Sequence, residues 1–231
     1  MPTVGAVALR LAHPFADLYG CGSLLTHVAV SLLRALIGFA LGAVAGVLLG
    51  VSMGSIRIAR GLMEPMVELL RPLCPIAWLP FAIAVFKMRN LPELFGFGHT
   101  GTALDQVQQG MVFVLFFGTI FPVLTNTLDG VTGVRQAYVR LARTLGAPRS
   151  QLFFHVYLPA ALPMILTGLR QGIGTCWMVI IAAEMLPGSD SGIGYLLMYA
   201  ADKCDIDIVV TAMLVIAVTG AALNFVMLRL M

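Results

Sequence analysis

The stretch AYVRLARTLGAPRSQLFFHVYLP, residues 137–159, is the one long basic interruption in an otherwise apolar sequence. It contains Arg140, Arg143 and Arg149 and no acidic residue, and Arg135 lies two residues before it. Loops rich in Lys and Arg remain on the cytoplasmic side of a membrane. We therefore expect this stretch to be a cytoplasmic segment between two membrane spans.

Its interior predicts two short helices, Tyr138–Leu145 and Arg149–Tyr157, separated by a Gly-Ala-Pro turn at 146–148. The glycine suits the left-handed position that ends a helix, and the proline suits the start of the next one. We expect Leu158-Pro159 to break the second helix before the next apolar run begins. A connector needs only a few residues, so a folded hairpin here indicates a docking device.

The composition places the chain among membrane proteins. Of its 231 residues 59% are hydrophobic and 11% are charged, whereas soluble domains carry about 25% charged residues. The net charge of +3 is small and the basic residues fall on loops, so nothing indicates nucleic-acid binding. The four cysteines are far apart, without the spacing of a zinc site or a disulfide framework. The predicted fold is an all-α polytopic helical bundle of about five spans.

The spacing within the basic stretch resembles the cytoplasmic signature of permease subunits of bacterial ABC importers. That signature reads EAA, three residues, Gly, nine residues, Ile, one residue, Leu-Pro. The corresponding residues here are Arg140-Leu141-Ala142, Gly146, Val156 and Leu158-Pro159. The flanking runs ARTLGAP, LPAALPMILTGLR and AAEM are similar to the nitrate, sulfonate, taurine and bicarbonate branch. Arg140 and Leu141 depart from the signature's Glu and first Ala, which bears on the contacts of the docking helix.

This resemblance extends from about Pro2 to Leu228 and implies the type I ABC importer permease fold. It implies that the chain is not an enzyme and holds no cofactor. The implied partners are two ABC ATPase subunits, a second permease copy, an external solute-binding protein and the lipid of the bacterial inner membrane. Met1-Pro2-Thr3 resembles the opening of the external linker after the family's first span, so that span is expected to be missing. Residues 1–26 would then be external and 27–231 the transmembrane domain.

Five apolar runs are long enough to cross a bilayer core of about 30 Å. They are His27–Val51, Met63–Phe86, Gly110–Leu128, Ala160–Ala183 and Ile208–Leu228. Residues 52–62 carry arginines and are expected to form a cytoplasmic loop, whereas 87–109 and the acidic 193–207 are expected outside. Five crossings place the N-terminus outside and the C-terminus in the cytoplasm.

The first run carries a glycine at every fourth position. Gly38, Gly42, Gly46 and Gly50 predict a groove where another helix can approach closely. Arg34, in the same run, is expected to extend toward the interface or to pair with another group. Glu184 is expected to end the fourth run at the outer surface.

Several prolines interrupt the second run and predict a kinked or unwound helix. Pro75 and Trp78 lie in its densest part, Pro72 to Pro80. Irregular backbone at membrane depth is tolerated where it lines a cavity or is buried in protein. The segment can therefore line the translocation path or serve only as a packing kink, and the sequence leaves both open.

The fourth run carries a polar stripe on one helical face. Thr167, Arg170, Gln171 and Thr175 belong to it. Such a stripe must face protein or water, so we expect these residues on the translocation path. Arg170 either attracts an anion or pairs with Glu68 or a helix C-terminus for assembly.

The resemblance also implies which hairpin residues couple to the ATPase. The apolar docking face would comprise Leu141, Ala142 and Leu145, and Arg140 and Arg143 could pair with acids on the ATPase. The coupling segment continues through Gly146 and Ala147. The two arginines could equally serve membrane topology alone, because any basic residue there would satisfy it.

The sequence contains no catalytic constellation and no metal-ligand spacing. A phosphate-binding GxxxxGK[ST] loop and an HExxH motif are both absent from it. We predict the permease of an ATP-driven importer for a small anion of the nitrate, sulfonate (taurine) or bicarbonate type. The alternatives are a permease of the same branch for a vitamin precursor and, from other classes, an ATP-independent channel or secondary carrier or a membrane hydrolase. The alternatives from other classes leave the predicted hairpin unexplained.

Overall fold

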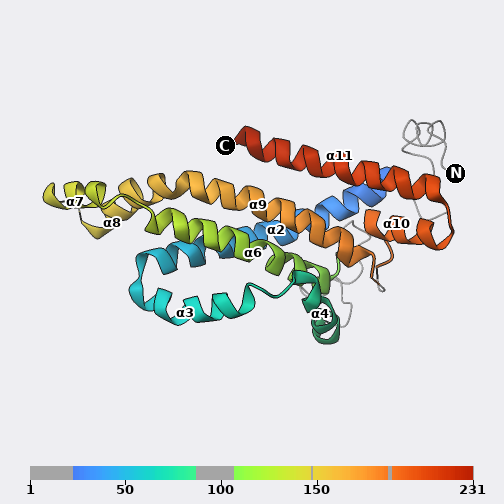
Figure 1. The fold of residues 1–231 in the computed structure, drawn as a ribbon, viewed down its shortest axis with the longest axis horizontal. Helices are drawn as coiled ribbons and strands as arrows, with labels where there is room; N and C mark the ends of the chain where they lie inside the picture. The colour runs from blue at the N-terminus through green and yellow to red at the C-terminus, as the bar shows by residue number, and fades with distance from the viewer. Residues whose placement is uncertain (1–22, 87–106, 147, 187–188, 231) are drawn as a thin grey trace, which may run out of the picture.

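The computed structural model describes residues 23–86, 107–146, 148–186 and 189–230, and the elements that it contains there are helices (Figure 1). The elements are α2 Leu24–Ser55, α3 Arg57–Leu70, a 3₁₀ turn Pro75–Trp78, α4 Leu79–Phe86, α6 Gln109–Thr132, α7 Gln136–Thr144, α8 Arg149–Leu152, a π turn Phe153–Tyr157, α9 Leu158–Glu184, α10 Ile193–Asp202 and α11 Ile206–Leu230. The prediction of an all-α membrane bundle is confirmed. Most of the predicted external segment 1–26, and residues 87–106 of the predicted external loop, lie outside the described residues.

Three long helices, α2, α6 and α9, form the centre of the bundle (Figure 1). The glycines of α2 face α6, as their close contacts show. A Cβ on Gly46 would lie 2.9 Å from Ile120 O, and one on Gly50 would lie 2.7 Å from Thr127 Cβ. The predicted glycine groove is therefore confirmed, and its partner is a helix of the same chain.

The segment 52–62, predicted to be a cytoplasmic loop, is helical apart from one turn residue, while its side of the membrane stays a prediction. Helix α2 continues to Ser55, and α3 begins at Arg57. The chain reverses at Ile56, whose backbone is extended (φ −116°, ψ 112°). After this turn α3 runs back beside the core (Figure 1), so the arginines that suggested a loop lie at the start of a helix instead.

The predicted second span is broken in the middle, as its prolines indicated. Helix α3 ends at Leu70, the 3₁₀ turn follows at Pro75–Trp78, and the two arms meet at 92°. Pro72 and Pro75 have no N–H to continue the helical hydrogen bonds, which accounts for the break. Counted as one span, the bent pair makes five candidate spans among the described residues; without it there are four.

The predicted break at Leu158-Pro159 is wrong. Helix α8 passes through the π turn into α9, and Leu158 keeps right-handed helical backbone angles (φ −64°, ψ −48°). A proline in a regular helix collides with the carbonyl four residues earlier. Here that residue is His155, inside the wider π turn, which accommodates the ring of Pro159. The helix therefore runs uninterrupted from the hairpin into the bundle.

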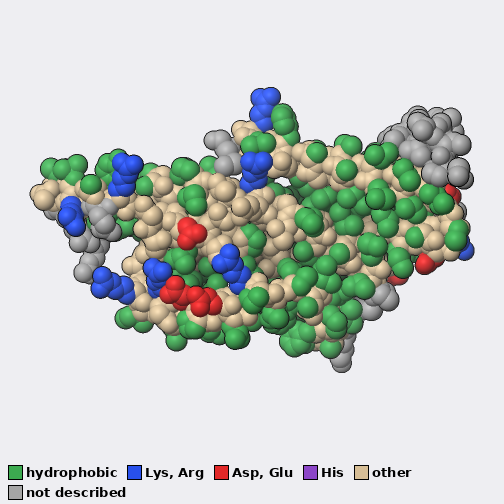
Figure 2. Space-filling view, in the orientation of Figure 1, with side chains coloured by type: hydrophobic (Ala, Val, Ile, Leu, Met, Phe, Trp, Pro, Cys, Tyr) green, Lys and Arg blue, Asp and Glu red, His purple; other side chains and the backbone are tan. Residues whose placement is uncertain are grey.

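The two ends of the bundle differ in charge. Helices α7 and α8 project at one end, and α10 with the start of α11 lies at the other (Figure 1). Several Lys and Arg side chains lie toward the α7 end of the face shown in Figure 2. The exposed arginines of α3 and α7 include Arg57, Arg60 and Arg140. Exposed Asp202 and Lys203 lie at the opposite end.

Candidate functional site

A hairpin of α7 and α8 forms the projecting end of the molecule. Its base is held by a small apolar cluster of Val134, Val139 and Leu152, each at most 7% exposed. These residues come from both sides of the turn, so the cluster joins the two helices. The hairpin is thus a folded unit on the bundle, as the sequence predicted.

The turn of the hairpin depends on Gly146. Its φ is +77°, in the left-handed region that glycine adopts without steric cost. Leu145 N donates to Leu141 O before the turn, and Leu152 N donates to Pro148 O after it. The predicted left-handed end of the first helix is confirmed, whereas Ala147 lies outside the described residues.

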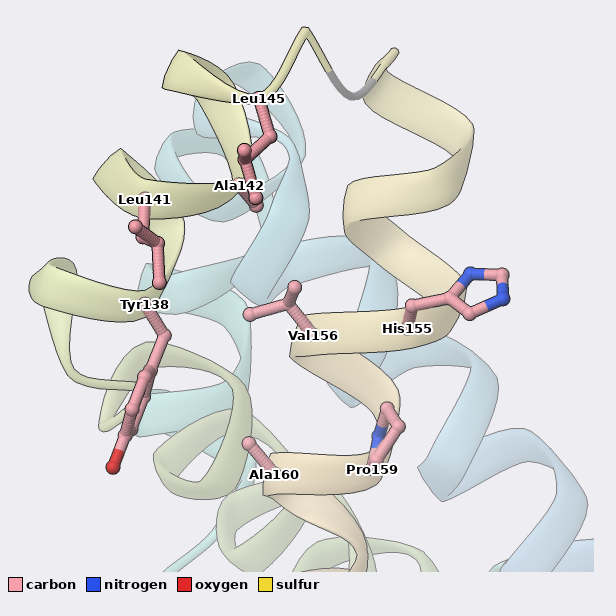
Figure 3. Close-up of a pocket in the computed structure, with 8 residues that line it drawn as sticks. All are labelled: Tyr138, Leu141, Ala142, Leu145, His155, Val156, Pro159 and Ala160. Atoms are coloured by element: carbon pink, nitrogen blue, oxygen red, sulfur yellow. The ribbon is translucent and has the colours of Figure 1, made fainter.

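An apolar groove of about 490 Å³ runs between α7 and the chain that leads into α9 (Figure 3). It is lined by Tyr138, Leu141, Ala142, Leu145, His155, Val156, Pro159 and Ala160. Leu141 is 61% exposed and Leu145 is 80% exposed, although both are large apolar side chains. Exposed apolar patches of this kind mark interaction surfaces.

The structure brings together the three residues predicted to form the docking face, Leu141, Ala142 and Leu145. It adds Tyr138 and Val156, which the sequence reading did not assign to this face. In Figure 3, Val156 points toward the α7 side of the groove, and the His155 ring points away from it. Val156, on the side of the groove opposite α7, could have been predicted from the sequence by assuming that the two hairpin helices face each other.

Two arginines predicted to contact the ATPase, Arg140 and Arg143, belong to α7. Arg140 is exposed on α7 and does not line the groove. Arg143 belongs to α7 by its backbone, and its side chain lies outside the described part of the structure.

A second cavity, of about 290 Å³, lies where the α3 arm breaks against α6 and α9. Its lining comprises Arg71, Leu73, Pro75, Phe117, Gly118, Phe121, Pro122, Thr125, Gln171 and Thr175. Three of the six residues predicted for a translocation path, Pro75, Gln171 and Thr175, therefore meet in one cavity.

The other three residues of that prediction lie outside the lining. Trp78 stacks on Phe117, which does line the cavity, with 4.7 Å between ring centroids. Thr167 Oγ1 donates to the carbonyl of Pro163 in its own helix. Arg170 Nε donates to Asn224 Oδ1 of α11 at 2.7 Å, so its partner is Asn224 rather than Glu68.

A buried polar network lies at the other end of the bundle. Of the two alternatives predicted for Arg34, the structure shows pairing, whereas the other members of the network were not predicted. Arg34 Nη1 donates to Glu184 Oε1 at 2.9 Å, and Ser31 Oγ donates to Glu184 Oε2 at 2.7 Å. Arg34 Nη1 also donates to the carbonyl of Ser191 at 2.7 Å. Glu184 is the last residue of α9, as predicted for the end of this span, but its side chain does not lie at the surface, because the residue is 1% exposed and ion-paired.

The same network holds the turn before α10. The backbone N–H of Gly192 donates to His27 Nδ1, that of Ile193 to Ser31 Oγ, and that of Gly194 to Glu184 Oε2. Helix α2, the end of α9 and the start of α10 are thereby joined. A useful signal was present in the sequence, since single charges in two apolar runs tend to pair.

The residues that the structure describes contain no group of three or more His, Cys, Asp or Glu side chains placed to hold a metal ion. The two candidate sites are therefore the apolar hairpin groove and the cavity at the helix break.

The chain is similar to known membrane transport proteins. Residues 38–231 match the family described as binding-protein-dependent transport system inner membrane component. A Methanocaldococcus jannaschii protein designated as an ABC transporter permease is 39% identical over 97% of this chain and 77% of its own length. The nitrate import permease protein NrtB of Synechocystis is 34% identical over 93% of this chain and 71% of its own. The taurine transport system permease protein TauC of Escherichia coli is 34% identical over 86% of this chain and 65% of its own length.

Proposed function

The chain belongs to the family of binding-protein-dependent transport system inner membrane components, and we propose that it is the membrane subunit through which an ATP-driven importer passes a small anion. Membership of this family makes it a multi-pass transport permease. The proposal adds how it is driven, what it carries and how it is assembled.

The hairpin groove is the observation that carries the proposal. We assign Leu141, Ala142 and Leu145, with Tyr138, to a surface that docks on a separate cytoplasmic ATPase subunit. Their exposure fits a surface that becomes buried on assembly. Arg140, Arg143, Gly146 and Ala147 would complete the contact, with the arginines facing acids of the ATPase.

The continuous helix gives the docking surface a physical connection to the membrane part. From Arg149 to Gln171 the chain stays helical through the π turn, a distance of about 33 Å at 1.5 Å per residue. ATP-driven closure of two ATPase subunits would move two hairpins and tilt α9. Movement of this kind alternates access to a fixed central path.

The proposed path includes the cavity at the helix break and the six residues predicted for it, Trp78, Pro75, Thr167, Arg170, Gln171 and Thr175. A nitrate-type or sulfonate-type anion is the proposed cargo, because relatives that match most of this chain are nitrate and taurine permeases. A second permease copy and an external solute-binding protein would complete the importer. The hairpin end would lie in the cytoplasm, as its arginines favour.

Co-purification with the ATPase subunit and ATP-dependent nitrate and taurine uptake in proteoliposomes test this proposal. Leu141→Asp should abolish both ATPase association and uptake, because a carboxylate would have to be buried in an apolar contact. Ala137→Asp is the matched control: it adds the same charge to an exposed position of α7 that does not line the groove. Equal behaviour of the two variants, or uptake without ATP, would contradict the proposal and favour an ATP-independent carrier.

A further inference from the structure

The cavity at the helix break contains an arginine that the sequence reading did not assign to any path. We propose that Arg71 and Gln171 form an anion-binding station in this cavity, at which the cargo of the importer pauses. The inference rests on the proposed function, for it names the residues that would select an anion within the path.

The cavity lies at the middle of the membrane-spanning part. Phe121 and Pro122 are central in the 24 residues of α6, and Gln171 is the central residue of the 27 in α9. Arg71 follows the 14-residue helix α3, which places it about 20 Å along the helix from the Arg-rich end. In a bilayer core of about 30 Å, this is well inside the membrane.

Arg71 forms no ion pair with a described residue, although Glu68 lies one helical turn earlier on α3. Its guanidinium makes no hydrogen bond or ion pair with any described residue, Glu68 included. The residue is exposed and lines the cavity. An intramembrane cation without a partner is costly unless it faces water or an anion. A guanidinium also offers planar, paired donors that suit nitrate, carboxylate and sulfonate oxygens.

Gln171 supplies a second donor across the cavity. Its Oε1 accepts a 2.8 Å hydrogen bond from Asn126 Nδ2, which fixes the amide so that its oxygen is occupied. The Nε2 group, which can only donate, makes no hydrogen bond with a described residue. The hydroxyls of Thr125 and Thr175 already donate to backbone carbonyls, so they contribute little to binding a negative charge.

Arg170, which the sequence favoured as an anion attractor, differs from Arg71 in two respects. Its Nε is bonded to Asn224, and the residue does not line the cavity. Of these two arginines, only Arg71 makes no side-chain hydrogen bond or ion pair with a described residue.

Fluorescence quenching by iodide tests anion binding without requiring transport or the ATPase. The chain has two tryptophans: Trp177 is buried at 5% exposure, and Trp78 stacks on the cavity residue Phe117. In a Trp177→Phe background, quenching of Trp78 by iodide reports the local anion concentration, and quenching by neutral acrylamide reports access alone. The measurements use the purified chain in phosphatidylcholine nanodiscs and in an uncharged detergent.

Arg71→Gln should lower the iodide quenching constant about fivefold, the effect of one unit charge at this range in a partly hydrated site, and leave acrylamide quenching unchanged. Gln171→Leu should lower it about threefold, as expected for one lost hydrogen bond. Arg71→Lys should retain most of the quenching. The control Arg60→Gln, on the same helix but ion-paired with Glu64 and away from the cavity, should change neither constant.

Equal iodide quenching in wild type and Arg71→Gln would overturn the inference. A dependence on Arg71 seen only in nanodiscs would also overturn it, because Arg71 would then serve a lipid headgroup. If Arg71→Gln alters acrylamide quenching too, the Arg71→Lys variant decides between the explanations. Iodide quenching retained in Arg71→Lys supports the anion-binding station, and loss of iodide quenching in Arg71→Lys overturns it. Since no ATPase is present, this outcome is independent of whether the docking proposal fails.

Discussion

Arg34 and Glu184, 150 residues apart in sequence, form an ion pair of 2.9 Å between side chains that are 1% and 0% exposed. The pair joins the first part of α2 to the last residue of α9, at the end of the bundle opposite the hairpin (Figure 1). Ser31 and the turn before α10 satisfy the remaining lone pairs of the carboxylate. This end is therefore fixed, whereas the hairpin end presents a groove.

Loss of one member of the buried pair should destabilise the chain strongly. Glu184→Gln keeps the shape but removes the carboxylate charge with which the buried Arg34 pairs, and we expect a loss of about 3–5 kcal/mol in the free energy of unfolding. Thermal and denaturant unfolding of the detergent-solubilised chain measures it. Arg60→Gln, which breaks the exposed pair with Glu64, is the control and should remain close to wild type. Similar stability of Glu184→Gln and wild type would show that the pair contributes nothing.

The turn that closes this network should tolerate no side chain at Gly192. Its φ is +120°, and a Cβ there would overlap the Glu184 carboxylate. We expect Gly192→Ala to cost about 2–4 kcal/mol from backbone strain and crowding, measured by the same unfolding assay. Gly174→Ala, on α9 with no atom within 4 Å of the new Cβ, should be neutral or stabilising. If the two alanines behave alike, the close approach of this turn to Glu184 is not maintained.

The contact between α2 and α6 should be sensitive to a single methyl group. A Cβ on Gly50 would lie 2.7 Å from Thr127 Cβ and 2.8 Å from Leu124 O. Gly50→Ala should therefore cost about 1–3 kcal/mol as the helices separate, visible as a lower unfolding temperature. The matched variant Gly61→Ala has open space around it on α3 and should not show this loss.

The sequence predicted the spans and the hairpin because each depends on local patterns: apolar length, prolines, and arginines without acids. It could not predict that α8 continues into α9, because the π turn that accommodates Pro159 has no local signature. Arginines at the start of α3 resembled a loop, since positive charge reports the side of the membrane and not the local backbone.

Pairings between distant helices were the other limit. Arg34 with Glu184 and Arg170 with Asn224 depend on how the helices rotate against one another, which no local pattern specifies. The apolar side of the groove proposed for docking was predicted in part, as Leu141, Ala142 and Leu145, because these residues lie on α7 or directly after it. Arg71 was not assigned to the cavity because its approach to Gln171 depends on the 92° bend.

At Gly146 the hairpin turn should require a residue that tolerates left-handed backbone angles, whereas the size of its side chain should matter little. Gly146 has φ +77° and open space around its Cβ position. Gly146→Ala should cost about 1 kcal/mol of backbone strain, or about a fivefold weaker ATPase association by that amount of free energy. Gly146→Asn should bind nearly as wild type, because Asn tolerates this conformation. Titration of the ATPase subunit against both variants measures the difference, and equal binding by Gly146→Ala and wild type would show that the turn does not position the docking face.

The central claim is that the α7–α8 hairpin lies in the cytoplasm and is covered by an ATPase subunit. A membrane-impermeant maleimide tests it on Leu145→Cys, in a chain whose native cysteines are replaced by alanine. Leu145 is 80% exposed at the hairpin tip, so the cysteine should react in inside-out vesicles and be protected when the ATPase subunit is added. Labelling from the external side, or labelling that the ATPase leaves unchanged, would contradict the account.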